Sequence, residues 1–426
     1  MNQFKKPTPD ETKPLEPLYF DAKAGSYWLE SSPGHFLSLS QKDAKLHLRV
    51  AGFSKEEYVG ALNQLEHVFF SAQRERSVHY SGPLAGHSVG SFMTSDGRRI
   101  LVTSQARRIV AKAGSTEHLM GFLHDLLGSD QTELLLGWLK CARETQLAGD
   151  FRPGQLLALA GPSGCGKSLL QALIGEWLGG RTAKPYRYMI GETAFNGDLA
   201  GAEHWCIEDE NSSTDIRQRR KFGASLKEAV VNREISIHDK GHKAITLPTF
   251  RRTTLSVNDE PENLSILPPL DGSILDKITL FRCQRAEVGS DRAKTWARFT
   301  GELPALAAEV EAWKLRKALK DPRYGVVSYQ HPELVECLTA LSPEERLRNL
   351  IDEVVFSKRE LAWQGTSEEL ERDLRNSAFS FAVDKLLTYS SACGVYLARL
   401  QSRFPQRFTK EKTRTGAKWT IEIPEG

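Results

Sequence analysis

A glycine-rich segment between an apolar run and an amphipathic stretch constrains the fold of this chain more than any other part. The apolar run covers residues 155–160, and Gly161-Pro-Ser-Gly-Cys-Gly-Lys-Ser168 follows it in the pattern G-x-x-x-x-G-K-[ST]. Residues 169–178 then continue with the spacing of a helix. In such a strand–loop–helix unit, glycines let backbone N–H groups converge on phosphate oxygens at the start of the helix. The segment therefore predicts an α/β fold with a parallel sheet and a phosphate-binding loop.

The residue types of this loop indicate how it would bind a nucleotide. Lys167 offers a mobile positive charge to the β- and γ-phosphates, and the Ser168 hydroxyl takes a coordination place on Mg²⁺. Cys165 is interpreted as a small spacer residue and not as a redox switch. The expected cofactors are ATP and Mg²⁺. The predicted cofactor-binding residues are Gly161, Pro162, Ser163, Gly164, Cys165, Gly166, Lys167 and Ser168.

A second apolar run, His204-Trp-Cys-Ile207, ends in the acidic triplet Glu208, Asp209 and Glu210. Acids at the C-terminal end of a parallel strand face the crevice where ligands bind in open α/β sheets. The metal ligand and the general base would be either Glu208 with Asp209 or Asp209 with Glu210. Asp209 belongs to both pairs and is the predicted metal ligand. A solvated acidic turn is the alternative.

A third run, from Phe250 to Val257, ends in Asn258. An asparagine at this place could orient the attacking water beside the γ-phosphate, although an asparagine after a strand is also a common turn residue. Its position behind the phosphate loop and the acidic strand favours the catalytic interpretation.

A basic hairpin is predicted between the second and third runs. Apolar alternation on both sides of Asp239-Lys240-Gly241 indicates two strands joined by a glycine turn. From Asp215 to Lys243 there are eight Lys and Arg against four Asp and Glu. Such clusters bind phosphate backbones without sequence preference, although an ordinary solvated hairpin would look the same. The predicted DNA contacts here are His238, Lys240, His242 and Lys243.

The composition of the whole chain excludes several classes of protein. Its 426 residues carry 57 Lys and Arg against 54 Asp and Glu, a net charge of +3, with 40% hydrophobic residues. These values argue against disorder and against a uniformly basic nucleic-acid binder. Its six cysteines include no C-x-x-C pair, which argues against a zinc site or a disulfide framework. Without an apolar signal core or a run of ~20 apolar residues, the chain is expected in the cytoplasm of a bacterial cell, away from membranes.

In this order, the phosphate loop, acidic strand, basic hairpin and Asn-ended strand resemble the superfamily 3 helicases, a branch of the AAA+ ATPases of small viruses, phages and plasmids. The stretches 193–199, 258–264 and 267–277 are similar to the helicase part of phage- and plasmid-type primase-helicases. The specific part of the resemblance covers roughly residues 150–285. It implies a ring, usually a hexamer, with ATP between subunits and single-stranded DNA through the pore. It also implies that Asn258 is the sensor and that the 240–243 hairpin tip grips DNA.

Two departures from that family bear on the expected mechanism. Where the family has a basic pair after the sensor, this chain has Leu275-Asp276-Lys277. The residue that a neighbouring subunit would contribute to catalysis is therefore open among Arg251, Arg252, Lys277 and Arg282. In addition, the first 150 residues contain no D-x-D motif, the pair of aspartates with which a primase would hold its two metal ions. Primer synthesis by this chain is therefore not expected, and a separate primase or other replication protein is expected as a partner.

The C-terminal tail has the order of elements expected for a winged helix. Thr366-Ser-Glu-Glu369 fits the start of a capped helix, and further helices are predicted around 379–387 and 392–404. Two β runs with a basic turn follow. Winged helices bind DNA or other proteins. The predicted DNA contacts are Arg399, Arg403, Lys410, Lys412 and Arg414.

Six segments summarise the predicted organisation. They are a flexible arm (1–17), an N-terminal α+β domain (18–112), a helical collar broken near Gly128 (113–150), a P-loop AAA+-type ATPase core (151–289), a helical connector (290–360) and a winged-helix domain (361–426).

The leading hypothesis is an ATP-dependent, ring-forming DNA helicase or translocase that replicates a phage, plasmid or integrated mobile element. The alternative is an AAA+-type ATPase, for instance in phage defence, that senses DNA or a partner without unwinding. A non-enzymatic origin-binding scaffold is the third class, and the intact Lys167, Ser168 and acidic triplet argue against it.

Overall fold

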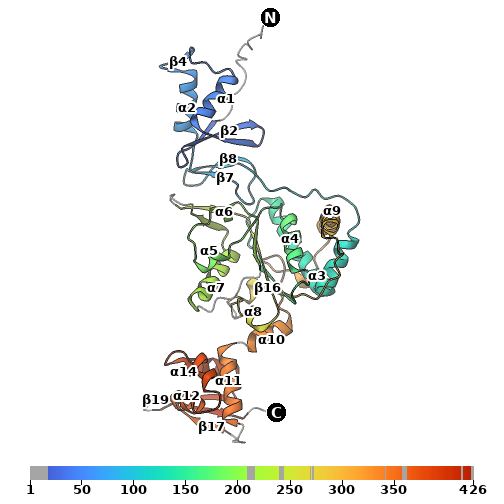
Figure 1. Cartoon of the computed structure of the whole chain (residues 1–426), viewed down its shortest axis with the longest axis vertical. Helices are drawn as coiled ribbons and strands as arrows, with labels where there is room; N and C mark the ends of the chain where they lie inside the picture. The colour runs from blue at the N-terminus through green and yellow to red at the C-terminus, as the bar shows by residue number, and fades with distance from the viewer. Residues whose placement is uncertain are drawn as a thin grey trace. The chain divides into compact units, whose positions relative to one another are not determined.

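The computed structural model describes residues 18–208, 216–238, 244–268, 270, 273–340, 342–356, 362–413 and 416–423. Contacts divide the chain into two compact units (Figure 1). One unit comprises Met1–Asn258 and Ile274–Tyr329, and the other comprises Asp259–Ser273 and Gln330–Gly426. None of the described helices combines the length and the apolar character needed to span a membrane.

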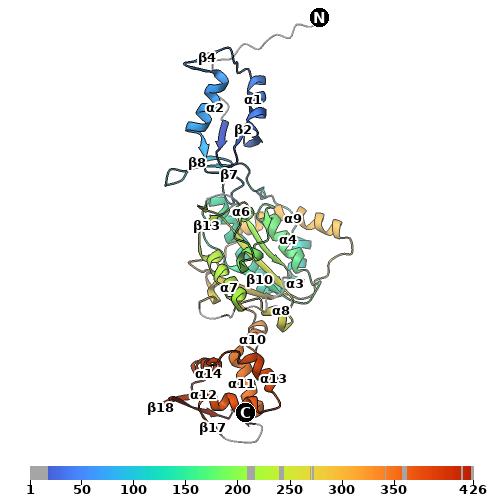
Figure 2. The same ribbon diagram turned by 60° about the vertical axis from the view of Figure 1, so that its left-hand side comes forward.

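A five-stranded, all-parallel sheet forms the centre of the first unit, as the sequence predicts. Its order is β11 (Thr182–Ala183), β12 (His204–Glu208), β15 (Arg252–Val257), β10 (Leu156–Ala160) and β16 (Ile278–Arg282). Every residue of β10 and β15 is buried, which explains why β10 is a continuous apolar run and why neither strand alternates between buried and exposed residues. Helices α3 and α4 lie on one side of this sheet, and α5 and α7 lie on the other (Figures 1 and 2).

The helices around the phosphate loop share one apolar core with the sheet. They are α3 (Glu117–Ala148), α4 (Lys167–Trp177) and α9 (Arg292–Ala312). Within α3 the backbone at Gly128 has φ 70° and ψ 173°, so the predicted break is confirmed. Leu126 and Trp138 of α3 pack in the same cluster as Leu157 and Leu173. The segment predicted as a collar therefore belongs to the phosphate-loop unit, and so does α9 from the segment predicted as a connector.

The predicted hairpin is confirmed as an antiparallel pair. Strand β13 (Glu234–Ile237) pairs with β14 (Ile245–Pro248), and the residues of the tip, 239–243, lie outside the described part. The inward-facing Ile235, Ile237 and Leu247 bury themselves against Trp205 of β12 and its neighbours. Around them lie α5 (Tyr186–Ile190), α6 (Gly197–Ala200) and α7 (Ile216–Val231), with the short helices η1 (Leu275–Lys277) and η2 (Lys317–Leu319) elsewhere in the unit.

The N-terminal part of this unit is α+β, with two small sheets and the separate two-stranded pair of β4 and β5 among its described residues. The first, in the order β3-β2-β1-β6, has α1 and α2 packed against it, and the second, in the order β7-β9-β8, packs on the hairpin through Ile100 and Val102. Its elements are β1 (Leu18–Asp21), β2 (Ser26–Ser32), β3 (His35–Leu39), α1 (Gln41–Val50), β4 (Tyr58–Val59), β5 (Leu62–Asn63), α2 (Gln64–Glu75), β6 (Ser77–Val78), β7 (Tyr80–Gly82), β8 (Gly90–Met93) and β9 (Arg99–Val102).

The second unit combines helices with a three-stranded sheet of order β17-β19-β18. Thr366 caps α12 in a complete capping box with Glu369, as predicted. Leu347 and Ile351 of α11 enter the core of this unit, so the segment predicted as a connector is divided between the two units. The elements are α8 (Pro261–Leu264), α10 (Pro332–Ala340), α11 (Pro343–Val354), β17 (Ala362–Gly365), α12 (Ser367–Arg375), α13 (Ser380–Leu386), α14 (Ala392–Arg403), β18 (Phe408–Thr413) and β19 (Gly416–Glu422).

Candidate functional site

The phosphate loop runs from the C-terminal end of β10 into α4. Gly164 and Gly166 have φ angles of 72° and 122°, which residues with a side chain rarely adopt. A Cβ on Gly161 would collide with the carbonyl oxygen of Cys283, so a larger residue does not fit there. The N-cap of α4 is Gly166, which has no side chain to occupy the free N–H groups of the first turn. This backbone can therefore hold an anion at the helix N-terminus.

Lys167 is buried inside the loop and held by three oxygen atoms. Its Nζ donates to the carbonyl oxygens of Gly161 at 2.6 Å and Pro162 at 2.8 Å, and to Oδ1 of Asn258 at 3.0 Å. Asn258 follows β15, which pairs in parallel with β10, so the two strands end at the same edge of the sheet. The structure thus brings together the lysine and the asparagine that were selected from the sequence.

Glu208 ends β12, one strand farther along the same edge. Its carboxylate accepts a hydrogen bond from Nζ of Lys184 at 2.8 Å, in an ion pair that remains partly exposed. Asp209 and Glu210 lie outside the described residues. The choice between the two predicted acidic pairs therefore stays a prediction.

Two of the four basic candidates are engaged at the opposite edge of the sheet. Arg251 donates from Nε to the carbonyl oxygen of Ala229 at 2.9 Å, and Arg252 lies 4.7 Å from the centre of the Phe250 ring. Burial lowers the pKa of both guanidinium groups to about 10. Both side chains are buried within the chain, so neither is placed to reach a ligand outside it.

The other two basic candidates lie at different ends of β16. Lys277 precedes the strand, and its Nζ lies 2.7 Å from Oδ1 of Asp276. Arg282 ends the strand at the edge that carries the phosphate loop, and its register partner on β10 is Ala160. Arg282 is half-buried, and its backbone N–H donates to Oε1 of Gln131 at 2.8 Å.

A pocket beside the loop contains residues that the sequence did not point to. Besides Ser163, Ser168, Lys167 and Asn258, it is lined by the 288–290 loop and by one face of α9. That face carries Arg292, Thr295 and Trp296. Arg292 and Trp296 are four positions apart and therefore share a helix face, which is the signal that could have drawn attention to them.

Of the predicted DNA contacts that the structure describes, Arg399 and Arg403 are in ion pairs within the chain. The backbone N–H of His238 donates to Oδ1 of Asn196 at 2.7 Å. On α14, Arg399 and Arg403 form ion pairs of 3.4 Å and 2.8 Å with Glu344 and Glu345 of α11. The ammonium of Lys410 lies 5.2 Å from the centre of the Trp419 ring, and Lys412 is exposed. Lys240, His242, Lys243 and Arg414 lie outside the described residues.

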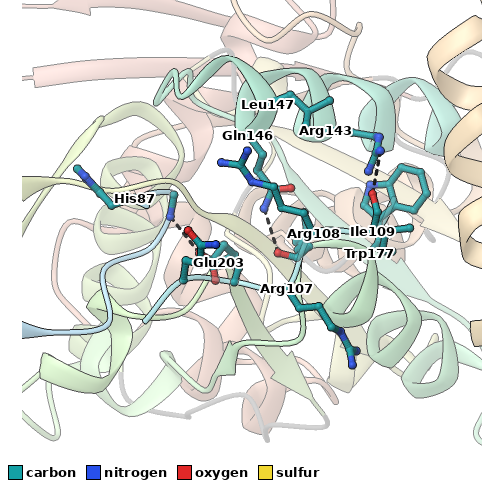
Figure 3. A pocket seen from close by; sticks show the side chains of 13 residues that line it. His87, Arg107, Arg108, Ile109, Arg143, Gln146, Leu147, Trp177 and Glu203 are labelled. Carbon is teal, nitrogen blue, oxygen red and sulfur yellow. Dashed lines mark hydrogen bonds between the residues drawn. The ribbon is translucent and has the colours of Figure 1, made fainter. Parts of the chain in front are cut away.

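A second pocket, near the far end of α4, is a packing feature (Figure 3). It lies under the extended segment 103–116, whose Arg107 N–H donates to the carbonyl oxygen of Gly179 at 3.2 Å. Nη2 of Arg143 donates to the carbonyl oxygen of Ile109 at 3.0 Å, and the buried Glu203 accepts from the N–H of Gly86 at 3.0 Å. The bonds of Arg107 and Arg143 tie the segment to the core, and Glu203 is engaged by the chain itself.

Comparison with known proteins gives one family model and several solved structures. A model described as a family of unknown function (DUF5906) matches residues 159–269, which contain the phosphate loop, the hairpin and Asn258. No curated protein matches the sequence. Two apo structures of the NrS-1 C-terminal region match at TM-scores of 0.56 and 0.57, each over 96% of both chains, with 13% identity.

The chain has the fold of the NrS-1 C-terminal region. The resemblance noted from the sequence is confirmed at the level of the fold, over almost the whole length. The JCV helicase covers 54% of this chain and 61% of its own, at 14% identity and a TM-score of 0.27. The SCCmec type IV Cch helicase covers 91% of this chain and 73% of its own, at 10% identity and a TM-score of 0.29. Scores of this size do not establish a shared fold.

Proposed function

We propose that this protein is an ATP-dependent, ring-forming DNA helicase or translocase that serves replication of a phage, plasmid or integrated mobile element in the bacterial cytoplasm. One observation carries the proposal. Lys167 and Asn258 meet at the C-terminal edge of a parallel sheet, beside a helix whose N-terminus has no side-chain cap. This arrangement suits a nucleoside triphosphate, because its phosphate oxygens would replace the carbonyl oxygens as hydrogen-bond acceptors of the lysine.

The residues of the pocket fit ATP and Mg²⁺. Lys167 would bind the β- and γ-phosphates, while the exposed hydroxyl of Ser168 and the carboxylate of Asp209 would hold the metal. Bound Mg²⁺ neutralises charge on the phosphates. Asn258 would orient the attacking water, and Glu208 or Glu210 would act as the general base. Trp296 offers a flat apolar wall to the nucleotide base.

The finer fold assignments belong to the same proposal. In the first unit, the strand before the phosphate loop lies between two strands that come much later in the chain, and we interpret this core as AAA+-type. In the second unit, the helices α12, α13 and α14 are followed by the strands β18 and β19, and we interpret this order as a winged helix. In a hexameric ring, a basic residue of one subunit would stabilise the transferring phosphate of the next. Since Arg251 and Arg252 are buried, we retain Lys277 and Arg282 for this role.

DNA would be held by the basic hairpin in the pore. Strands β13 and β14 are anchored by buried isoleucines, so the stem of the hairpin is rigid while its tip carries Lys240, His242 and Lys243. Together with His238, these residues would contact the phosphates of one strand without reading its sequence.

The first test is ATP hydrolysis with and without single-stranded DNA, measured together with unwinding of a forked duplex. Lys167→Ala should abolish hydrolysis, because the ammonium that faces the phosphates is lost. Lys45→Ala is the matched control, because Lys45 is exposed on α1 and far along the chain from the loop. Hydrolysis that survives in Lys167→Ala would refute the site. Sedimentation in ATP should show a hexamer, and a strict monomer would refute the ring.

A second candidate is a DNA- or partner-sensing ATPase that does not unwind. The ion pairs of Arg399 and Arg403 favour it, because a helix whose arginines are already neutralised suits contact with a protein. Reversing the charge of the hairpin with Lys240→Glu and Lys243→Glu separates the two functions. A translocase should lose both unwinding and stimulation of hydrolysis by DNA. Stimulation that persists in this variant at low salt would favour the sensor.

A further inference from the structure

Two cysteines distant in the sequence meet at the phosphate loop. Cys165 lies inside the loop, and Cys283 directly follows β16. The N–H of Cys283 donates to the carbonyl oxygen of Ala160 at 2.6 Å, and the N–H of Ala286 donates to the carbonyl oxygen of Cys165 at 3.2 Å. These two backbone bonds hold the segment after β16 directly against the loop.

The two thiols also contact each other. The thiol of Cys283 hydrogen-bonds to the sulfur of Cys165, and both side chains are buried in one apolar cluster. Nζ of Lys167 lies 3.9 Å from Sγ of Cys165. Cys165 therefore has a second thiol and an ammonium group as its polar neighbours, in a place where water is largely excluded.

These neighbours change the chemistry of Cys165. The hydrogen bond from Cys283 and the charge of Lys167 lower the pKa of the Cys165 thiol to about 6, against the opposing effect of burial. At Cys206 and Cys393, by contrast, burial raises the pKa of the thiol to about 12, and nearby glutamates add to the effect. Near neutral pH the reactive thiolate form is thus favoured at Cys165, and thiolates are the species that oxidants attack.

We propose that Cys165 and Cys283 form a reversible oxidation site, whose disulfide locks the phosphate loop against nucleotide. The oxidant is a hydroperoxide. The Cys165 sulfur attacks one peroxide oxygen, the O–O bond breaks, and Cys165 becomes a sulfenic acid as the first water (or alcohol) leaves with the thiol proton. The Cys283 sulfur then attacks the Cys165 sulfur, the S–O bond breaks, and its hydroxyl leaves with the Cys283 proton as water. Two thiols are oxidised and one peroxide is reduced.

The disulfide would act on nucleotide binding through the loop backbone. Gly164 and Gly166 flank Cys165, and their positive φ angles mark the points where the loop turns. A bond of ~2 Å between the sulfurs draws this turn toward the segment after β16, since hydrogen-bonded thiols are farther apart than that. The N–H groups that would surround a phosphate are displaced with it. This consequence rests on the proposed nucleotide site, whereas formation of the disulfide does not.

The experiment treats the full-length protein with hydrogen peroxide. Peptide mass mapping should show one linkage, between Cys165 and Cys283, and dithiothreitol should remove it. Affinity for a fluorescent ATP analogue should fall at least about tenfold on oxidation and recover on reduction. Cys283→Ser should bind the analogue with or without peroxide. Cys337→Ser is the matched control, because Cys337 is a partly exposed cysteine of the second unit, and it should respond like the natural protein.

The outcomes separate this inference from the proposed function. Absence of the Cys165–Cys283 linkage after peroxide treatment would overturn the oxidation site, whether or not the protein binds nucleotide. A linkage that leaves affinity unchanged would overturn the lock. If the reduced protein does not bind the ATP analogue, the proposed nucleotide site is wrong, and the proposed effect of the disulfide on nucleotide binding is wrong with it. Peptide mass mapping would still decide whether the oxidation site exists. If Cys283→Ser does not fold, Cys283→Ala replaces it, and the mapping on the natural protein needs neither variant.

Discussion

Lys167 is held in place by two acceptors of its own loop and by a third from outside it. An ammonium group with little access to water needs such acceptors, because a buried charge without partners is unstable. The carbonyl oxygens of Gly161 and Pro162 supply two of them, and Asn258 supplies the third from another strand. Two of the three contacts of Lys167 are therefore local to the loop, and the third depends on the position of β15 in the sheet.

This division predicts different effects on binding and on hydrolysis. Asn258→Ala should lower ATP hydrolysis by about 10²-fold, because the attacking water loses its orienting group. Affinity for ATP should change much less, since Gly161 and Pro162 still hold Lys167. Steady-state hydrolysis and equilibrium binding measure the two effects. Asn376→Ala, at an exposed position of the second unit, is the control. Equal losses of binding and hydrolysis would contradict a sensor role.

The buried His204 predicts how stability depends on pH. It is fully buried in β12, with Nε2 2.8 Å from Oγ1 of Thr254, and burial lowers its pKa to about 3. In the unfolded chain a histidine takes up a proton near pH ~6.5. As pH falls from there toward ~3, only the unfolded state binds this proton, so the free energy of unfolding decreases by up to ~1.4 kcal/mol per pH unit.

Denaturant unfolding between about pH 7 and about pH 5 tests this effect. His204→Gln should unfold with a shallower dependence on pH than the natural protein. His35→Gln, which changes an exposed histidine, should keep the full dependence. An identical slope in His204→Gln and the natural protein would show that His204 does not contribute.

The strands place the candidate site through their order in the sheet. β10 and β15 are separated by about a hundred residues of chain, yet they are neighbours with Ala160 opposite Val257. Parallel neighbours end at the same edge, so the residues that follow them, Gly161 and Asn258, meet there. The same rule places Glu208, at the C-terminal end of β12, at this edge of the sheet. Arg251 and Arg252 lie where β15 begins, and therefore at the opposite edge.

Helix α3 needs glycine at its bend but does not need it at Gly121. Gly128, with φ 70° and ψ 173°, has a conformation that is essentially restricted to glycine. Gly128→Ala should therefore lower the free energy of unfolding by ~1–3 kcal/mol. Gly121→Ala in the same helix should raise it by ~0.5–1 kcal/mol, since nothing lies within 4 Å of the added Cβ. Thermal unfolding of both variants measures the difference, and a loss of stability in both would contradict this account of the bend.

Among the described residues, the core around the phosphate loop and the core of the second unit have no residue in common. The core of the second unit is formed by α11 to α14 with the three-stranded sheet. Each core is large enough to support a folded unit of its own. We therefore expect calorimetry to resolve two unfolding transitions.

Trp419 tests this independence. It is 1% exposed at the centre of the second core, and Trp419→Ala should destabilise that unit by ~3–5 kcal/mol. In Trp419→Ala only the unfolding transition of the second unit should shift, and the rate of ATP hydrolysis without DNA should equal that of the natural protein. Trp28→Ala, in the N-terminal part of the first unit, is a control that should leave the second unit's transition in place. A single transition that moves as a whole in Trp419→Ala would show that the two units unfold together.

Most elements of this fold could be predicted from the sequence because their signals are local. The glycines around Lys167, the break at Gly128 and the capping box of Thr366 all depend on backbone conformations within a few residues. The boundaries between domains were harder to predict. A helix such as α3 or α11 shows its apolar face in the sequence, but the pattern does not say which core that face enters.

The sequence by itself determined the phosphate loop, the strands that lead to Glu208 and Asn258, and the stem of the hairpin, because each rests on neighbouring residues. Only the tertiary structure decided that Asn258 contacts Lys167, that Arg251 and Arg252 are buried, and that Trp296 lines the pocket. It also decided that Cys165, a spacer in the sequence, has Cys283 as its partner. The physical reason is the same in each case. Contacts between distant residues depend on the order of strands and the packing of helices, and periodicity along one segment carries no information about either.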